Sequence, residues 1–208
     1  VNRGFDEFFG PWPYEGLHRY LDPDELYWNT HPVRTTGYIT DVLNDQAISF
    51  IEQNRNRPFF LYLAHNAPHS PFRVPDKYIE KYLKKGLSLR AAKVYGMITS
   101  LDENLGRLLK TIDQVGIRKN TVVIFMSDNG GVSRHFRAGL RGEKGTVYEG
   151  GIRVPFIVRW PGEFPAGATV QAMAQHIDLF PTLCQLIGAI LPNGLKVDGK
   201  SILSLLRK

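Results

Sequence analysis

TVVIFMSDNGG, residues Thr121–Gly131, joins five apolar residues to an acid, an amide and two glycines. The apolar run, Val122–Met126, is typical of a strand buried on both faces, as in a parallel sheet covered by helices. Asp128 and Asn129 follow where that strand is expected to end. They fit either a simple turn, because Asn and Gly tolerate positive φ, or a ligand site at the carboxyl edge of the sheet.

Predicted helices and strands alternate along most of the chain. Apolar residues at helical spacing predict helices over residues 40–55, 76–86, 88–116 and 174–188. Dense apolar runs predict strands over residues 58–65, 121–127 and 154–162. Residues 1–37, rich in Pro, Gly, Tyr and Trp, predict irregular structure. The alternation predicts the α/β class, with a mostly parallel sheet sandwiched by helices, and no repeat or linker divides the chain.

Composition narrows the classes of protein to consider. The chain has 208 residues, 43% of them hydrophobic and 22% charged, which suits a folded globular core. The net charge of +6 permits an anionic ligand, but the basic residues are spread out, so nucleic acid is not indicated. No apolar run is long enough to span a membrane. The single cysteine, Cys184, excludes an intrachain disulfide and lies in a pattern typical of a buried, inert thiol.

Two predicted strands end in clusters of polar residues. His65–His69 follow the strand over residues 58–65, and Asp128 and Asn129 follow the next strand. The ends of neighbouring parallel strands meet at one sheet edge, where ligands bind in such folds. Asp128 and Asn129 offer the hard oxygens that Ca²⁺ or Mg²⁺ prefers. Because Ca²⁺ takes about six to eight oxygens, further carboxylates would have to come from elsewhere.

Three further residues are candidates for contact with a ligand. His69 lies in a loop with prolines on both sides, which suits either a general acid or anion ligand, or a surface histidine in a stiff turn. Lys144 lies between two glycines, where an ammonium could meet a phosphate or sulfate oxygen; a solvated loop lysine fits the same pattern. His135 belongs to the same Gly-rich segment, residues 129–153, and is a candidate substrate contact.

Taken together, these motifs resemble the sulfatase family of the alkaline phosphatase superfamily. The matching segments occur in the family's order, from about residue 4 to 203: GFDEFFG, PFFLYLAHNAPHSPF, VVIFMSDNGG, LRGEKGTVYEGGIRVPFIVRWPG and HIDLFPTLCQLIG. The run KGTVYEGGIRVP, which begins at Lys144, is highly specific. The resemblance implies an alkaline phosphatase-like fold and the hydrolysis of an aryl or carbohydrate sulfate ester.

The resemblance also implies roles for individual residues. Asp128 and Asn129 correspond to two ligands of one Ca²⁺. Lys144 corresponds to the lysine that binds a sulfate oxygen and stabilises the leaving oxygen, and His69 to the histidine that helps protonate that oxygen. The family's nucleophile is a formylglycine, made from Cys or Ser in a C/S-x-P-x-R motif and hydrated beside the cation. One of its hydroxyls attacks sulfur, and the other then eliminates sulfate.

Part of the family's pattern is missing from the chain. No C/S-x-P-x-R motif occurs, and Cys184 is followed by Gln-Leu-Ile-Gly. The family's N-terminal strand with paired aspartates and its small C-terminal antiparallel subdomain have no counterparts either. Residues 1–208 therefore resemble a single fragment of a sulfatase catalytic domain, and we expect the isolated chain to be inactive.

Two other functions stay open at this point. One is a phosphodiesterase or phosphonate hydrolase of the same superfamily, and the other is a truncated binding module without catalysis. The segment LRGEKGTVYEGGIRVP is most similar to that of members acting on sulfated sugars such as N-acetylgalactosamine 6-sulfate. The resemblance implies a sulfated small molecule or carbohydrate as partner, and a periplasmic, secreted or lysosomal location. Four aromatic residues would either stack on a sugar ring or anchor their loops: Trp12, Tyr14, Tyr27 and Trp28.

Overall fold

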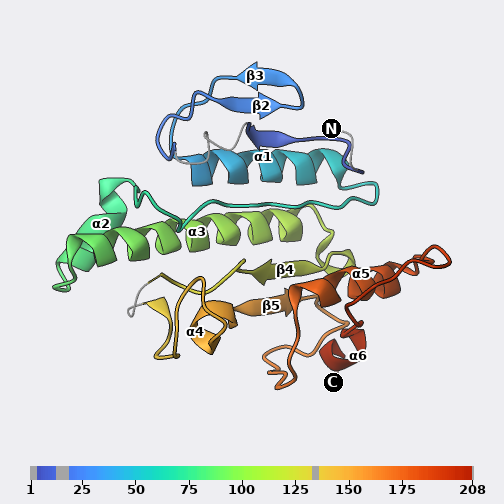
Figure 1. Cartoon of the computed structure of the whole chain (residues 1–208). Helices are drawn as coiled ribbons and strands as arrows, with labels where there is room; N and C mark the ends of the chain where they lie inside the picture. Colours follow the sequence, from blue (N-terminus) through green and yellow to red (C-terminus); the bar gives the residue numbers. More distant parts are fainter. Residues whose placement is uncertain (1–3, 13–18, 133–135, 208) are drawn as a thin grey trace. The chain divides into compact units, whose positions relative to one another are not determined.

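The computed structural model describes residues 4–12, 19–132 and 136–207 of the chain. The chain divides into two compact units, Val1–Ile117 and Arg118–Lys208. Figure 1 shows the course of the chain through both units. The expected α/β class is confirmed, because helices and small sheets follow one another along the chain. Across the described residues, none of the helices combines the length and the apolar character needed to cross a membrane.

The first unit begins with a three-stranded antiparallel sheet, ordered β1 (Phe9–Pro11), β2 (Leu26–Trp28), β3 (His31–Val33). The expectation of irregular structure is wrong for these segments. Asn29 turns the chain between β2 and β3 with a φ of 56°, and its Oδ1 accepts a hydrogen bond from the N–H of Phe8 at 2.9 Å. Strands of three residues, two of which contain a proline, show too little alternation for a sequence pattern to reveal them.

Three helices complete the first unit and confirm the helices expected there: α1 (Ile39–Asn54), α2 (Asp76–Leu83) and α3 (Leu89–Gln114). The Ser88 side chain caps α3, and Gly116, with a φ of 81°, follows its last turn. The N-cap of α1 is Tyr38, so the helix begins one residue before the expected start at residue 40. Thr40 is fully buried in the first turn, where its side chain faces the protein interior.

The core of the first unit is built from side chains of all three helices and the loops between them. Residues 58–65 run beside this core, where Leu63 packs against it and the Phe59 ring meets the Phe50 ring edge-on at 5.7 Å. Phe60 and Tyr62 alternate with these residues and are 62% and 73% exposed. The alternation is that of an extended chain. The expected strand is nevertheless wrong, because no described segment pairs with its backbone.

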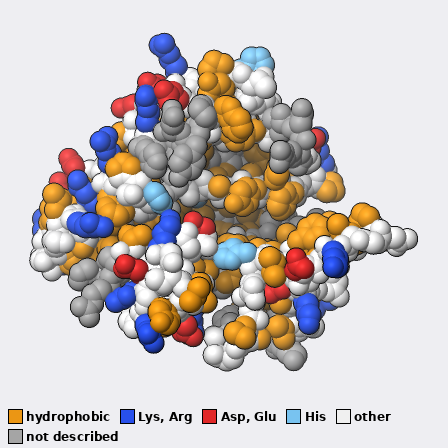
Figure 2. Space-filling view, in the orientation of Figure 1, with side chains coloured by type: hydrophobic (Ala, Val, Ile, Leu, Met, Phe, Trp, Pro, Cys, Tyr) orange, Lys and Arg blue, Asp and Glu red, His pale blue; other side chains and the backbone are white. Residues whose placement is uncertain are grey.

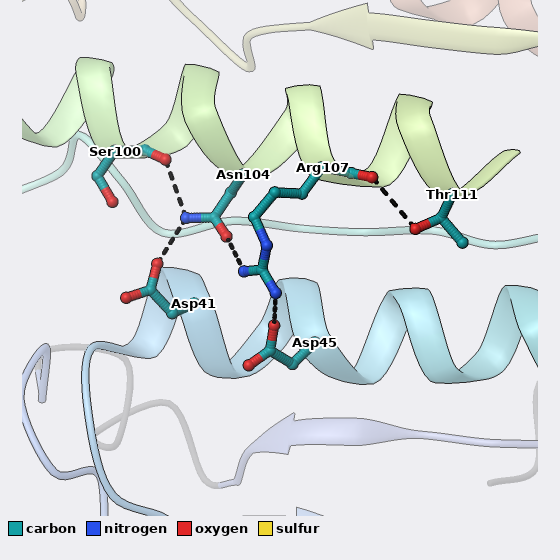
Figure 3. Close-up of polar contacts among 6 residues, drawn as sticks. All are labelled: Asp41, Asp45, Ser100, Asn104, Arg107 and Thr111. Carbon is teal, nitrogen blue, oxygen red and sulfur yellow. Dashed lines mark hydrogen bonds and ion pairs between the residues drawn. The ribbon is translucent and has the colours of Figure 1, made fainter. Parts of the chain in front are cut away.

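A polar network joins α1 to α3 (Figure 3). The buried Asn104 side chain donates from Nδ2 to Asp41 Oδ1 at 2.6 Å and to the Ser100 carbonyl at 2.9 Å. Its Oδ1 accepts a hydrogen bond from Arg107 at 3.0 Å, and Arg107 also pairs with Asp45 at the surface, at 2.5 Å. Asn104 is thus satisfied at both ends of its amide, which sets the register of the two helices.

Replacement of Asn104 by Leu should lower the free energy of unfolding of the first unit by about 1–3 kcal/mol, because it removes the buried link to Asp41. The matched control is Asp45→Asn, which weakens the exposed pair with Arg107 and should cost less than about 1 kcal/mol. Urea unfolding followed by circular dichroism measures both. Equal losses for the two variants would contradict the assigned role of Asn104.

The described residues of the second unit form the elements η2 (Arg118–Asn120), β4 (Val123–Met126), α4 (Glu149–Ile152), β5 (Phe156–Arg159), η4 (His176–Asp178), α5 (Leu179–Ile187) and α6 (Leu203–Leu206). β4 and β5 confirm the two expected strands. They pair antiparallel, with Met126 opposite Phe156, and every strand pair between described residues has this direction. The parallel pairs expected from the apolar runs are therefore not among them, because an apolar run does not fix strand direction. The expected burial on both faces is also wrong, since β4 is half-buried and two residues of β5 are exposed.

The C-terminal part of the second unit is tied together at Asp178. Its carboxylate accepts hydrogen bonds from the backbone N–H groups of Lys200 and Gln175, both at 2.8 Å. These donors hold the pKa of Asp178 below its usual value. α5, the expected helix, follows and ends at Gly188 in the left-handed conformation. Cys184 on α5 is a free thiol, half-buried rather than fully buried as expected.

Candidate functional site

Asp128 and Asn129 begin the loop that leaves β4. Asp128 Oδ1 accepts the backbone N–H of Asn129 at 2.9 Å, and its Oδ2 accepts the Asn129 side-chain amide at 2.6 Å. Ser127 Oγ donates to the Asn129 carbonyl at 3.2 Å. The two side chains predicted to be metal ligands are therefore adjacent and mutually oriented, and the Asp128 carboxylate is exposed to solvent.

Backbone hydrogen bonds join the first residues of the Gly-rich segment, Gly130 and Gly131, to its later part around Lys144 and Gly151. The Gly130 N–H donates to the Gly151 carbonyl at 2.9 Å, and the Lys144 N–H donates to the Gly131 carbonyl at 3.0 Å. The structure thereby brings the predicted metal ligands and Lys144 into one local assembly. Lys144 is held through its main chain, and its side chain is exposed.

Glycines allow this close approach because there is no space for a side chain between the two segments. A Cβ atom on Gly130 would lie 2.0 Å from the Gly150 carbonyl oxygen. One on Gly150 would lie 2.3 Å from the Gly142 oxygen, and one on Gly151 2.2 Å from the Thr146 oxygen. Contacts this short cannot be relieved by moving a flexible side chain, because the opposing atoms belong to the backbone. The sequence pattern of glycines is therefore a packing requirement.

Further hydrogen bonds shape the turn that presents Lys144. Thr146 Oγ1 donates to the Glu143 carbonyl at 2.8 Å and accepts the Glu143 N–H at 3.1 Å. Arg137 donates to the Gly142 carbonyl at 2.6 Å. The Arg141 guanidinium lies 3.9 Å from the centre of the Tyr148 ring. Both arginines therefore stabilise the loop and are engaged within it.

The assembly has the chemistry of a site for a cation and an anion together. A carboxylate and an amide oxygen suit a hard divalent cation, and an exposed ammonium nearby suits an anionic oxygen. Two residues supply only part of a calcium coordination shell. No group of three or more His, Cys, Asp or Glu residues able to hold a metal occurs among the residues that the structure describes. Asp128 and Asn129 thus fit a cation site as part of a larger set of ligands.

His176 reaches the same loop, although its sequence context gave no reason to select it. Its Nε2 lies 3.0 Å from the Ser127 carbonyl, directly before Asp128. The residue opens η4, and Asp178 of the same turn is the residue that anchors the C-terminal segment. The only sequence signal for this contact was a histidine near the start of the helix expected over residues 174–188. His176 therefore contacts the backbone at the residue from which the Asp128 loop begins.

His69 lies in the first unit, in the loop after residues 58–65. Its ring Nδ1 lies 2.7 Å from the Ser70 carbonyl, and its backbone N–H donates to the Asn66 carbonyl at 2.8 Å. The ring is exposed. His65, four residues earlier, has both ring nitrogens buried. Its burial lowers the pKa to about 4, so its ring is neutral near pH 7.

The remaining candidates have mixed outcomes. His135 and Tyr14 lie outside the described residues. Trp12 is 67% exposed. Trp28 and Tyr27 belong to β2, and the Trp28 ring meets the Phe9 ring edge-on at 5.8 Å. This contact favours an anchoring role for Trp28 over a free stacking platform.

Gly130→Ala should destabilise the second unit by about 1–3 kcal/mol, because the new methyl group would meet the backbone of the Gly-rich segment. Gly106→Ala is the matched control. A Cβ there has open space on an exposed face of α3, so this variant should gain about 0.5–1 kcal/mol. Urea unfolding and hydrogen exchange at Gly130 and Lys144 measure the effects. Wild-type stability and exchange in Gly130→Ala would contradict the close approach of the two loops.

Comparison with known proteins shows the family to which the chain is similar. A family model described as Sulfatase matches residues 1–189. An uncharacterized sulfatase, YdeN, of Escherichia coli (strain K12) is 34% identical over 209 residues, covering 97% of this chain and 36% of its own length. The N-acetylgalactosamine-6-sulfatase of Mus musculus is 32% identical over 232 residues, covering all of this chain and 43% of its own length. The chain thus spans less than half of these relatives.

Solved structures show the same likeness. The crystal structure of Ps i-CgsB in complex with k-i-k-neocarrahexaose superposes with a TM-score of 0.89 at 31% identity, covering 97% of this chain and 50% of that one. A phosphonate monoester hydrolase from Silicibacter pomeroyi superposes with a TM-score of 0.63 at 23% identity, covering 99% of this chain and 48% of that one. The second likeness concerns the fold alone.

Proposed function

Because this chain belongs to the sulfatase family, we propose that the whole protein containing it hydrolyses sulfate esters. The observation that carries the proposal is the local assembly in the second unit, where backbone hydrogen bonds hold the Asp128 loop and Lys144 together. Sulfate ester hydrolysis places negative charge on the sulfate oxygens and on the leaving oxygen. Positive groups fixed before the reaction begins stabilise that charge without reorganisation.

Each residue has a defined part in this proposal. The Lys144 ammonium binds a sulfate oxygen and stabilises the leaving oxygen as the S–O bond breaks. His69 donates a proton to that oxygen, so that it departs as an alcohol. Asp128 and Asn129 supply oxygens to a divalent cation, which we propose is Ca²⁺, as part of a larger ligand set. When bound, the cation would add a fixed positive charge beside the sulfate.

The nucleophile is proposed to come from outside these residues. No C/S-x-P-x-R motif, the source of the family's formylglycine, occurs in the 208 residues. We therefore propose that residues 1–208 are part of one catalytic domain and that the isolated chain does not turn over substrate. The family resemblance favours a periplasmic, secreted or lysosomal location for the whole protein.

We propose a sulfated carbohydrate as the substrate class. Two similar proteins support this choice through their names: an N-acetylgalactosamine-6-sulfatase and a protein crystallised with a neocarrahexaose. The alternative of a phosphonate or phosphodiester substrate rests on a likeness of fold at lower identity. A sulfate ester and a matched phosphate ester of the same phenol, assayed side by side, separate the two, and preference for the phosphate ester would favour the alternative.

Lys144→Ala in the whole protein should lower kcat for an aryl sulfate by about 100-fold or more, because the charge on the leaving oxygen loses a fixed cationic partner. The backbone hydrogen bond from residue 144 to Gly131 stays available in this variant, so the loop keeps its anchor. The control is Lys196→Ala, which removes an exposed lysine elsewhere in the same unit. Sulfate release measured by ion chromatography reports both. If Lys144→Ala retains wild-type turnover, the assignment of Lys144 is wrong.

Asp128→Asn should raise the Ca²⁺ concentration needed for half-maximal activity by about tenfold or more, because an amide contributes no charge to the ligand set. The whole protein is first stripped with a chelator and then titrated with Ca²⁺, with heat of binding as a second readout. Asp198→Asn, an exposed acid of the same unit, should behave as wild type. Identical calcium dependence in the Asp128 and Asp198 variants would remove Asp128 from the cation site.

A further inference from the structure

The loop that carries His69 is closed by a hydroxyl from a distant part of the first unit. Tyr20 Oη donates toward two backbone carbonyls, that of His69 at 2.6 Å and that of Asn66 at 3.0 Å. A phenol has one proton, so the two acceptors share it, with the shorter contact to His69. Within the loop, the His69 N–H donates to the same Asn66 carbonyl at 2.8 Å. The turn from Asn66 to His69 is therefore held by one hydrogen bond within it and by the Tyr20 hydroxyl from another segment.

Tyr20 is itself firmly anchored. Its side chain is 1% exposed, and its carbonyl accepts the N–H of Ile39, the first residue of α1, at 2.9 Å. The next residue, Leu21, forms an antiparallel bridge with Tyr38, whose ring stacks on the Tyr20 ring at 6.1 Å and 24°. Burial raises the pKa of Tyr20 above its ordinary value, so the phenol keeps the proton that it donates. The hydroxyl is thus a fixed donor.

The orientation of the His69 ring depends on this turn. The ring is exposed, and its Nδ1 lies 2.7 Å from the carbonyl of the next residue, Ser70. The ring thus contacts the backbone of its own loop, and the His69 carbonyl is held by the Tyr20 hydroxyl. If Nδ1 donates to Ser70, a neutral ring carries no proton on Nε2, and only the protonated ring can donate from Nε2. A shift of the turn would therefore move the donating atom directly.

We propose that Tyr20 is a positioning residue for His69, acting through the two carbonyls that its hydroxyl binds. The proposal deepens the proposed function, because it rests on His69 being the group that protonates the leaving oxygen. Tyr20 does not touch the substrate in this proposal. It fixes the backbone from which the histidine side chain extends, and a misplacement of about 1 Å is enough to lower a rate by about 100-fold.

The test compares Tyr20→Phe with Tyr38→Phe in the whole protein. Both variants remove one buried phenolic hydroxyl from the same stacked pair, and the Tyr38 hydroxyl makes no hydrogen bond to this loop among the described residues. Substrates are aryl sulfates whose phenols span a range of pKa. Tyr20→Phe should lower kcat by about tenfold or more for the most basic phenol and much less for nitrophenol, because a good leaving group needs no proton. Tyr38→Phe should follow wild type across the series.

A second background separates positioning from general loss of structure. In a His69→Ala protein, adding Tyr20→Phe should cause no further loss of kcat, because the group that it positions is gone. Hydrogen exchange gives a readout without turnover: the His69 and Ser70 amides should exchange faster in Tyr20→Phe than in Tyr38→Phe. The inference is overturned if exchange is unchanged, if the loss is equal for all leaving groups, or if it persists undiminished in the His69→Ala background.

The outcomes also separate this inference from the proposed function. If the wild-type protein releases no sulfate from any ester while the His69 amide still depends on Tyr20, the proposed function fails and the catalytic reading of the loop fails with it. If the wild type is active and Lys144→Ala is not, but both phenylalanine variants match wild type, the sulfatase assignment stands and the role of Tyr20 is wrong.

Discussion

The candidate site in the second unit depends on one steric constraint, the absence of Cβ atoms where two loops meet. Gly130, Gly150 and Gly151 each face a backbone oxygen that would lie 2.0–2.3 Å from an added Cβ. Gly130 makes its close approach across the two segments, whereas Gly150 and Gly151 make theirs within the turn that carries Lys144. The Gly130 and Lys144 amides donate to carbonyl acceptors across the two segments at these positions. The position of Lys144 relative to Asp128 thus follows from backbone packing and not from an attraction between their charges.

Because backbone hydrogen bonds join the two segments, the Lys144 side chain stays available for a ligand. Lys144 is exposed and is held through its backbone, whereas the exposed Asp128 carboxylate also accepts hydrogen bonds from Asn129 within its own loop. Arg137 supports a carbonyl, and Arg141 lies against an aromatic ring. Figure 2 shows the other basic side chains scattered over the face drawn rather than gathered in one patch. Lys144 is therefore distinguished by its backbone hydrogen bond to the loop after Asp128 and not by the net positive charge of the chain.

The sequence predicted long helices and the site loops better than it predicted strands. α1, α2, α3 and α5 follow their apolar periodicity. The glycines around Lys144 were expected to let the backbone approach a ligand, and the structure shows them packed against other backbone segments of the chain. Residues 58–65 had the composition of a strand, but composition cannot say which segment supplies the hydrogen bonds of a ladder. The small sheet β1–β3 was missed because its strands are three residues long. His176 and Tyr20 were missed because each contacts a backbone carbonyl far away in sequence. Every residue has such a carbonyl, so the residue pattern does not indicate which one is contacted.

The antiparallel pairing of β4 with β5 has a consequence for how the site forms. Met126 stands opposite Phe156, so the chain leaves and re-enters the same end of a two-stranded ribbon, and the Asp128 loop and the Lys144 turn are both parts of the excursion between them. Apart from His176, the residues of that assembly lie within one segment of the chain, and its two joining hydrogen bonds, Gly130 to Gly151 and Lys144 to Gly131, close loops of moderate length. Contacts of this kind require little loop-closure entropy, so the ribbon and its excursion can assemble as one local folding unit. The segment from β4 to β5 could therefore be exchanged between related proteins as one piece, together with Asp128, Asn129 and Lys144 in their relative positions.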